Sequence, residues 1–222
     1  MQIAIINYPQ ALQSAVHGLN ELFEMANGLC DGVPPFTCSI LTLDDFTHSK
    51  FYDVIILPPS LKDDFYLNPS AQLLNWLTQQ HTQQATLCSA CSGAFILAQA
   101  GLLHGHTVTT HWALADAFSQ RFKEVTLDVH PILINQGNII TAGGVMSWLD
   151  LGLEIVAQHA GPSIMVQLGK NLVVDTGHRS QSYYQQFIPK RHHGDQGVLQ
   201  AQLFLDEHYH QKIKIVDLAA LG

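Results

Sequence analysis

The stretch Leu87-Cys88-Ser89-Ala90-Cys91-Ser92-Gly93-Ala94-Phe95 decides the fold, because it joins a strand pattern to a helix pattern within three residues. ATLCS (85–89) is predicted as a buried strand and GAFILAQAGLL (93–103) as the helix after it. Cys91 then lies at the bend, where Gly93 avoids a Cβ clash and the free amides of the helix start favour a thiolate. We expect an exposed, reactive thiol; the alternative is a small buried apolar residue.

On both sides of this stretch, apolar runs repeat the order strand then helix. QIAIIN (2–7), FTCSILTL (36–43) and YDVIILPP (52–59) lack polar alternation, as parallel strands buried on both faces do. Helical spacing over 12–26 and 71–82 separates them. Short strand candidates at 107–110 and 138–141 precede an apolar helix that begins near Gly144. The order predicts an α/β layered domain with a parallel sheet.

The composition and charge change after about residue 172. Residues 1–169 hold four basic and thirteen acidic residues and would repel a phosphate backbone, whereas residues 170–222 hold six and five. The stretch 173–196 has no sustained period and is predicted as a linker, and a new helical pattern follows Gly197. We therefore expect one domain over 1–172, a linker over 173–196 and the start of a second domain over 197–222.

Composition also limits the compartment and the cofactors. Four cysteines in 222 residues do not make a disulfide framework, and the chain opens on a strand-like run instead of a secretion signal, which predicts a cytoplasmic protein. No apolar stretch approaches the roughly 20 residues of a membrane helix. Cys88 and Cys91 spell C-x-x-C, so a redox dithiol stays an alternative. The paired histidines do not match a zinc ligand set, and we expect neither a metal nor a cofactor.

His111 is the second candidate site residue. It stands twenty residues after Cys91, directly after the strand candidate 107–110. The carboxyl ends of neighbouring parallel strands converge on one crevice, so the imidazole could reach the thiol. The alternative is a loop histidine without a partner.

The segment LCSACSGAFILAQAGLLHGHTVTTHW (87–112) resembles the nucleophile-elbow region of the ThiJ/PfpI, or class I glutamine amidotransferase-like, superfamily, and more closely its GlxA-like branch of AraC-type transcriptional regulators. The segments 18–27, 141–156 and 185–195 agree in order with that branch. The resemblance implies a flavodoxin-like sensor domain, usually a homodimer, joined to an all-α AraC-type DNA-binding domain. Residues 197–222 would hold only the beginning of that domain. Residues 198–210 would be its first helix, and IKIVDLAALG (213–222) would be the opening helix of its first helix-turn-helix, ending at the turn residue Gly222.

A helix-turn-helix unit reads bases with its second helix, which this sequence does not include. Lys212 and Lys214 are also too few for strong phosphate binding. We therefore do not expect the chain as given to bind an operator specifically.

Two departures from the superfamily's enzymes favour a sensor. Those enzymes set the cysteine beside a carboxylic acid from the first helix, where this sequence has Ala15 flanked by Ser14 and Val16. They also carry a Gly-Gly pair that supplies an oxyanion donor, where Pro59 has no N–H and only Ser60 could still provide one.

Under the sensor hypothesis, a small polar or nitrogen-containing metabolite would bind in the crevice above the strand ends, near Ser60, Cys91, Ser92, Gly93 and His111. Trp112 and Trp148 are candidate pocket walls, although aromatic residues in such positions are more often core residues. The alternative is a cysteine-dependent hydratase, hydrolase or glyoxalase-like enzyme, with Cys91 as the nucleophile and His111 as the general base. A redox-responsive or purely structural module is a third possibility.

Overall fold

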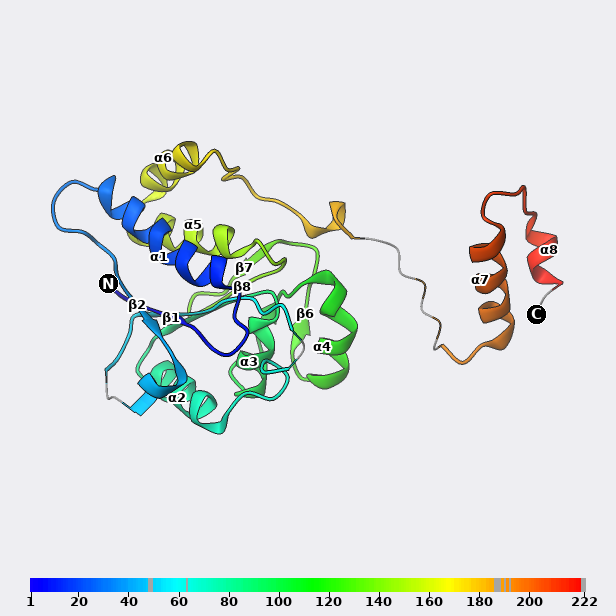
Figure 1. Cartoon of the computed structure of the whole chain (residues 1–222), viewed down its shortest axis with the longest axis horizontal. Coiled ribbons are helices and arrows are strands. Elements are labelled where there is room, and N and C mark those ends of the chain that lie inside the picture. Colours follow the sequence, from blue (N-terminus) through cyan, green and yellow to red (C-terminus); the bar gives the residue numbers. More distant parts are fainter. Residues whose placement is uncertain (48–49, 63, 186–188, 190, 192, 221–222) are drawn as a thin grey trace. The chain divides into compact units, whose positions relative to one another are not determined.

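The computed structural model describes residues 1–47, 50–62, 64–185, 189, 191 and 193–220. The chain divides into two compact units, Met1–Gln185 and Gln186–Gly222. In the first unit, helices cover both faces of a central sheet (Figure 1). This is the α/β architecture that the alternating strand and helix patterns predict.

Six strands form the sheet, in the order β2-β1-β3-β4-β8-β7. Every neighbouring pair is parallel except the edge strand β7, which runs antiparallel to β8. Four of the strands are almost wholly buried, which explains their continuous apolar runs. The strands are β1 (Gln2–Ile6), β2 (Thr37–Leu41), β3 (Val54–Leu57), β4 (Thr86–Ala90), β7 (Leu133–Asn135) and β8 (Ile139–Ala142).

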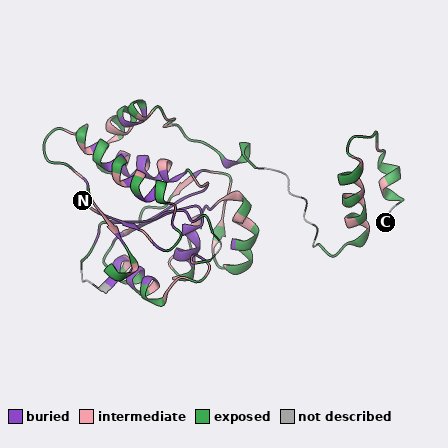
Figure 2. Cartoon of the chain, in the orientation of Figure 1, coloured by how far each residue is buried: buried purple, intermediate pink, exposed green. Residues whose placement is uncertain are grey.

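Helices pack on both faces of the sheet. One face carries α1 (Gln13–Gly28), α5 (Trp148–His159) and α6 (Pro162–Leu172), and the other carries α2 (Ala71–Thr82) and α3 (Gly93–Gln99). In α1, Ala15, Leu19 and Phe23 are fully buried, at the helical spacing read from the sequence. Figure 2 shows the buried residues concentrated in the sheet and on the inner sides of these helices.

The structure corrects the predicted strand at 107–110. Only β5 (Thr107–Val108) is a strand, and it pairs with β6 (Thr126–Leu127) in a separate two-stranded sheet. The neighbour of β4 is β8 instead. Several elements were not predicted. They are α6, whose amphipathic pattern was overlooked, and the short elements β6, β7, α4 (Ala115–Arg121), η1 (Leu43–Thr47), η2 (Trp112–Leu114) and η3 (Gln181–Tyr183).

The structure also differs at the predicted linker. Residues 173–185 belong to the first unit, where Ser180 pairs with Pro131 in an isolated bridge and Gln181 is only 2% exposed. We call residues 179–185 the strap. Much of the segment 185–195, and the predicted turn residue Gly222, lie outside the described residues.

The second unit contains two helices, α7 (Gln196–His208) and α8 (Ile215–Ala219). The Asp195 side chain accepts a hydrogen bond from Val198 N at 3.0 Å and so caps α7. Neither helix has a buried residue, and Ile215 is 83% exposed. Figure 2 shows this unit without buried residues among those described.

Candidate functional site

Cys91 lies at a strained bend between β4 and α3. Its φ is +54°, in the left-handed region that costs a non-glycine residue about 1 kcal/mol or more. The Cys91 backbone N–H donates to Ala142 O at 2.8 Å, which ties the bend to the end of β8. Gly93 is required by a close approach, because a Cβ there would lie 2.6 Å from Leu57 O on β3. The glycine at position 93 is therefore needed for close packing against the neighbouring strand β3.

The Cys91 thiol is buried, so the expectation that it is exposed is wrong. The residue is 4% exposed, and burial raises its pKa to about 11 although the Ser92 backbone N–H opposes the rise. Cys88 is fully buried inside β4, where burial raises its pKa as well. Both thiols are free. Burial of this kind favours the neutral thiol over the thiolate that catalysis needs.

No carboxylate among the described residues contacts Cys91. Ala15, at the position where the family's enzymes have their acid, is fully buried in α1. A phenol lies near instead: Tyr8 is 1% exposed, and its hydroxyl donates to Pro58 O at 2.5 Å. Burial raises the pKa of Tyr8, and the nearby Cys91 raises it further. The thiol therefore has a protonated neighbour that cannot act as a base.

The predicted oxyanion donor is already bonded. The Ser60 backbone N–H donates to Ser92 Oγ at 2.8 Å, and Ser60 Oγ donates to Gln10 O at 3.0 Å. Ser60 and Ser92 are both buried. The structure therefore brings together Ser60, Cys91, Ser92 and Gly93 as predicted neighbours, but in a closed arrangement.

The described contacts of His111 are with its own segment. Its Nδ1 accepts a hydrogen bond from Ala113 N at 3.1 Å and caps η2, and its ring centroid lies 5.3 Å from that of Trp112. Burial lowers the pKa of His111. The sequence argument assumed that the preceding strand neighbours β4, which it does not. Thr110 takes the place beside the elbow, where its Oγ1 donates to Cys91 O at 2.7 Å.

Gln181 of the strap joins these parts and was missed in the sequence. Its Nε2 lies within hydrogen-bond distance of Thr109 Oγ1 (3.0 Å), Thr110 O (3.1 Å) and Pro131 O (3.1 Å). Its Oε1 accepts from Trp112 N at 3.2 Å. The Gln181 amide thus links the strap to Thr110, whose hydroxyl donates to the backbone carbonyl of Cys91. An isolated glutamine in a polar stretch gives no periodic signal, so the sequence could not reveal this role.

A cavity of about 380 Å³ opens beside His111. The strap forms one wall, with Arg179, Gln181 and Tyr184. Trp112 and Met146 are among the residues opposite. Trp148 is instead 7% exposed and packs in the core against α1. Of the predicted site residues, His111 lines this cavity.

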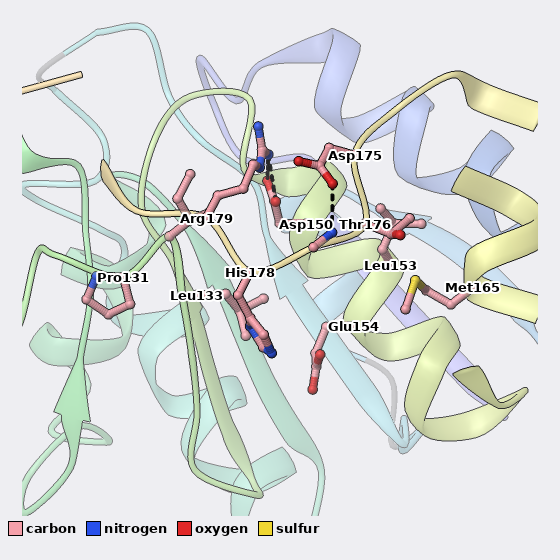
Figure 3. Close-up of a pocket in the computed structure, with 12 residues that line it drawn as sticks. Pro131, Leu133, Asp150, Leu153, Glu154, Met165, Asp175, Thr176, His178 and Arg179 are labelled. Atoms are coloured by element: carbon pink, nitrogen blue, oxygen red, sulfur yellow. Dashed lines mark hydrogen bonds and ion pairs between the residues drawn. The ribbon is translucent and has the colours of Figure 1, made fainter. Parts of the chain in front are cut away.

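A second, smaller cavity of about 160 Å³ lies beyond Arg179 (Figure 3). Asp150 and Glu154 of α5 line it, together with Asp175 and His178. Arg179 lines both cavities. Figure 3 shows its guanidinium paired with Asp150, at 2.6 Å from Oδ1 and 2.7 Å from Oδ2.

Within the described part of the chain, no group of three or more His, Cys, Asp or Glu residues could hold a metal ion. In the same part, no helix has the length and apolar character needed to cross a membrane.

The sequence of this chain is similar to both regulators and enzymes. It is 34% identical over 102 residues to the HTH-type transcriptional regulator CdhR of Pseudomonas aeruginosa, covering 46% of this chain and 30% of CdhR. It is 30% identical over 125 residues to the isonitrile hydratase of Pseudomonas putida, covering 52% of this chain and 49% of the hydratase. The matched stretch therefore spans half or less of either relative.

The fold is shared with solved structures. The crystal structure of an AraC family transcriptional regulator from Pseudomonas putida superposes with a TM-score of 0.67 at 15% identity, over 77% of this chain and 98% of that one. Residues 37–158, from β2 to the penultimate residue of α5, match the DJ-1/PfpI family. This range contains the elbow and most of the sheet, and it confirms the resemblance read from the sequence: the chain belongs to the DJ-1/PfpI family.

Proposed function

We propose that the first unit is the ligand-sensing domain of an HTH-type transcriptional regulator of the AraC kind, and that it does not act as an enzyme. The similarity to CdhR supports the regulator, and α7 and α8 would then begin a DNA-binding domain. The proposal includes a small-molecule effector, a homodimer, DNA as the partner of the second domain, and a place in the cytoplasm.

One observation carries the proposal: the cavity beside His111 has a wall built by the strap, directly before the second unit. An effector in this cavity would contact Arg179 or Tyr184. It would thereby shift the conformational equilibrium of the strap, which leads to the DNA-binding part. A ligand shifts such an equilibrium by as much as its affinity differs between the two states. The sensor domain would accordingly extend to about Gln185, beyond the predicted boundary at 172.

The closed elbow argues against turnover. Cys91 is buried with a raised pKa, and the Ser60 N–H is engaged by Ser92. Binding of the effector by Ser60, Cys91, Ser92 and Gly93 stays a prediction. In this proposal His111, which lines the cavity, faces the ligand.

The enzyme remains the second candidate, because the chain resembles an isonitrile hydratase and keeps the strained cysteine bend. Purified chain, wild type and Cys91→Ala, is assayed on an aryl isocyanide and on methylglyoxal. We expect no turnover above the uncatalysed rate. Hydration at an ordinary enzymic rate that Cys91→Ala abolishes would contradict the proposal.

The regulator is tested in cells. The intact gene is deleted, and transcripts are compared after complementation with wild type or Cys91→Ala. We expect a small set of transcripts to change on deletion and to return with both alleles. If no transcript responds to the deletion, the regulatory role is refuted.

A further inference from the structure

The cation Arg179 lines the cavity beside His111, and its charge is paired with the Asp150 carboxylate. Among the described residues that line it, Arg179 carries the one permanent charge, and no lining residue is a carboxylate. Burial lowers the pKa of His111, so its imidazole is neutral near pH 7. The attraction of an anionic ligand therefore depends on the N–H groups of Arg179 that Asp150 does not use.

Arg179 has donors to spare. Both hydrogen bonds to Asp150 come from Nη2, and the bond to this carboxylate raises the pKa of Arg179. A guanidinium also carries N–H groups on Nε and Nη1, which make no hydrogen bond to the described residues. Since Asp150 lines the smaller cavity and Arg179 lines both, a second carboxylate can approach from the side opposite Asp150.

The loop before α5 offers a second, weaker attraction for an anion. Residues 144–147 line the cavity and lead into the twelve-residue helix, whose N-cap Ser147 makes no side-chain cap hydrogen bond. The partial positive charge of a helix N-terminus favours an anion nearby. Asp150 in the first turn offsets part of this charge, so Arg179 remains the main attraction.

The other walls are apolar. Met146 is 57% and Tyr184 55% exposed, and together with Trp112 they surround the hollow. Large exposed apolar side chains around a cavity are typical of ligand sites, and about 380 Å³ is the size of a pocket for a small organic molecule.

We propose that this cavity binds a small organic carboxylate, with the carboxylate on Arg179 and an apolar body between Trp112 and Tyr184. The biological meaning of the site rests on the sensor role proposed above. Binding itself is measured on purified chain, so its failure is distinguishable from failure of the transcript experiment.

The test is isothermal titration calorimetry with benzoate and hexanoate, and with benzamide and benzylamine as the neutral and cationic counterparts of benzoate. We expect at least one carboxylate to bind, and benzamide and benzylamine to bind about tenfold more weakly or not at all. Equal binding of all three benzene derivatives, or no binding of either carboxylate up to about 10 mM, would overturn the proposal.

Four variants locate the site. Arg179→Gln should weaken carboxylate binding by about tenfold or more, and Lys170→Gln, which removes an exposed charge elsewhere on the first unit, should leave it unchanged. Asp150→Asn should bind benzoate as well or better, because it removes the competing carboxylate. If Arg179→Gln does not fold, Tyr184→Ala tests the site instead. This variant keeps the Arg179–Asp150 ion pair, and its affinity for benzoate should be lower than that of the wild type. Unchanged affinity in Tyr184→Ala and in folded Arg179→Gln would contradict the site.

Discussion

At the scale of single residues, Cys91 shows that backbone geometry and reactivity are separate properties. The bend with φ of +54° forms as the sequence predicts, yet the thiol beneath it is 4% exposed. Strand and helix patterns reveal a bend, because they depend on local spacing. They do not reveal what covers it: Tyr8 and Ser60 come from distant segments.

Cys91 should therefore react slowly. Since its pKa is raised from 9.0 to about 11, its thiolate fraction at about pH 7.5 is about 100-fold below that of an ordinary thiol. Alkylation by iodoacetamide, followed by peptide mass spectrometry, should be slower than for glutathione by at least this factor. Denatured chain is the control. Labelling of native Cys91 as fast as glutathione would contradict the buried thiol.

The same shift makes stability depend on pH. The folded chain keeps the Cys91 proton above the pH at which the unfolded chain releases it, so this contribution is full below about pH 9 and is lost as the pH rises through about 11. Urea unfolding should show a smaller free-energy decrease between these values in Cys91→Ala than in wild type, by about 2 kcal/mol. Identical slopes in the two proteins would argue against the shift.

Gly143 is the second informative residue, because a Cβ there would lie 2.0 Å from Gln181 Nε2. Gly143→Ala should displace the buried amide and lower the free energy of unfolding by about 2 kcal/mol. In a Gln181→Ala background the same substitution should cost much less, since the clash is gone. Gly28→Ala is the control, as no atom lies within 4 Å of its added Cβ. Additive effects of the two substitutions would refute the contact.

At the scale of elements, the buried strands and long amphipathic helices could be predicted and the strap could not. The apolar runs of β1 and β3 predict these strands, the short stretch before the bend predicts β4, and the helical spacing of apolar residues predicts α1. β5 has two residues, so its partner is set by tertiary packing and not by pattern. The predicted reach of His111 to the thiol depended on which strand neighbours β4, and that premise is wrong.

Gln181 is the buried side chain among the contacts that hold the strap, and this gives a prediction. Gln181→Ala removes its contacts with Thr109, Thr110 and Pro131, so amide hydrogen exchange over 179–185 should quicken by about tenfold or more while β4 stays protected. Gln158→Ala is the matched control, because that exposed glutamine bonds only Glu154 among the described residues. Unchanged exchange in the strap would show that other contacts hold it.

At the scale of the whole molecule, the two units differ in how much they bury. The first has a continuous core across both faces of the sheet, whereas α7 and α8 have no buried residue. Two short helices without a core are marginal in water. The sequence predicted this second unit from its change in composition, but it placed the boundary too early.

Limited trypsin digestion should therefore cut the second unit first. Lys212 and Lys214 should be cleaved before Arg121 and Lys123, which lie at the surface of the first unit. Mass spectrometry should show a persistent fragment that retains the strap. Simultaneous cleavage at all four sites would mean that the first unit is no more stable than the second.

The wall formed by the strap has a practical consequence for anyone who dissects this protein. Cutting the gene where the amino-acid composition changes, near residue 172, would discard Arg179, Gln181 and Tyr184 and leave the hollow beside His111 as an open trough. A compound screen on such a fragment would find no ligands, because one wall of the cavity would be missing. The shortest piece worth screening ends no earlier than Gln185.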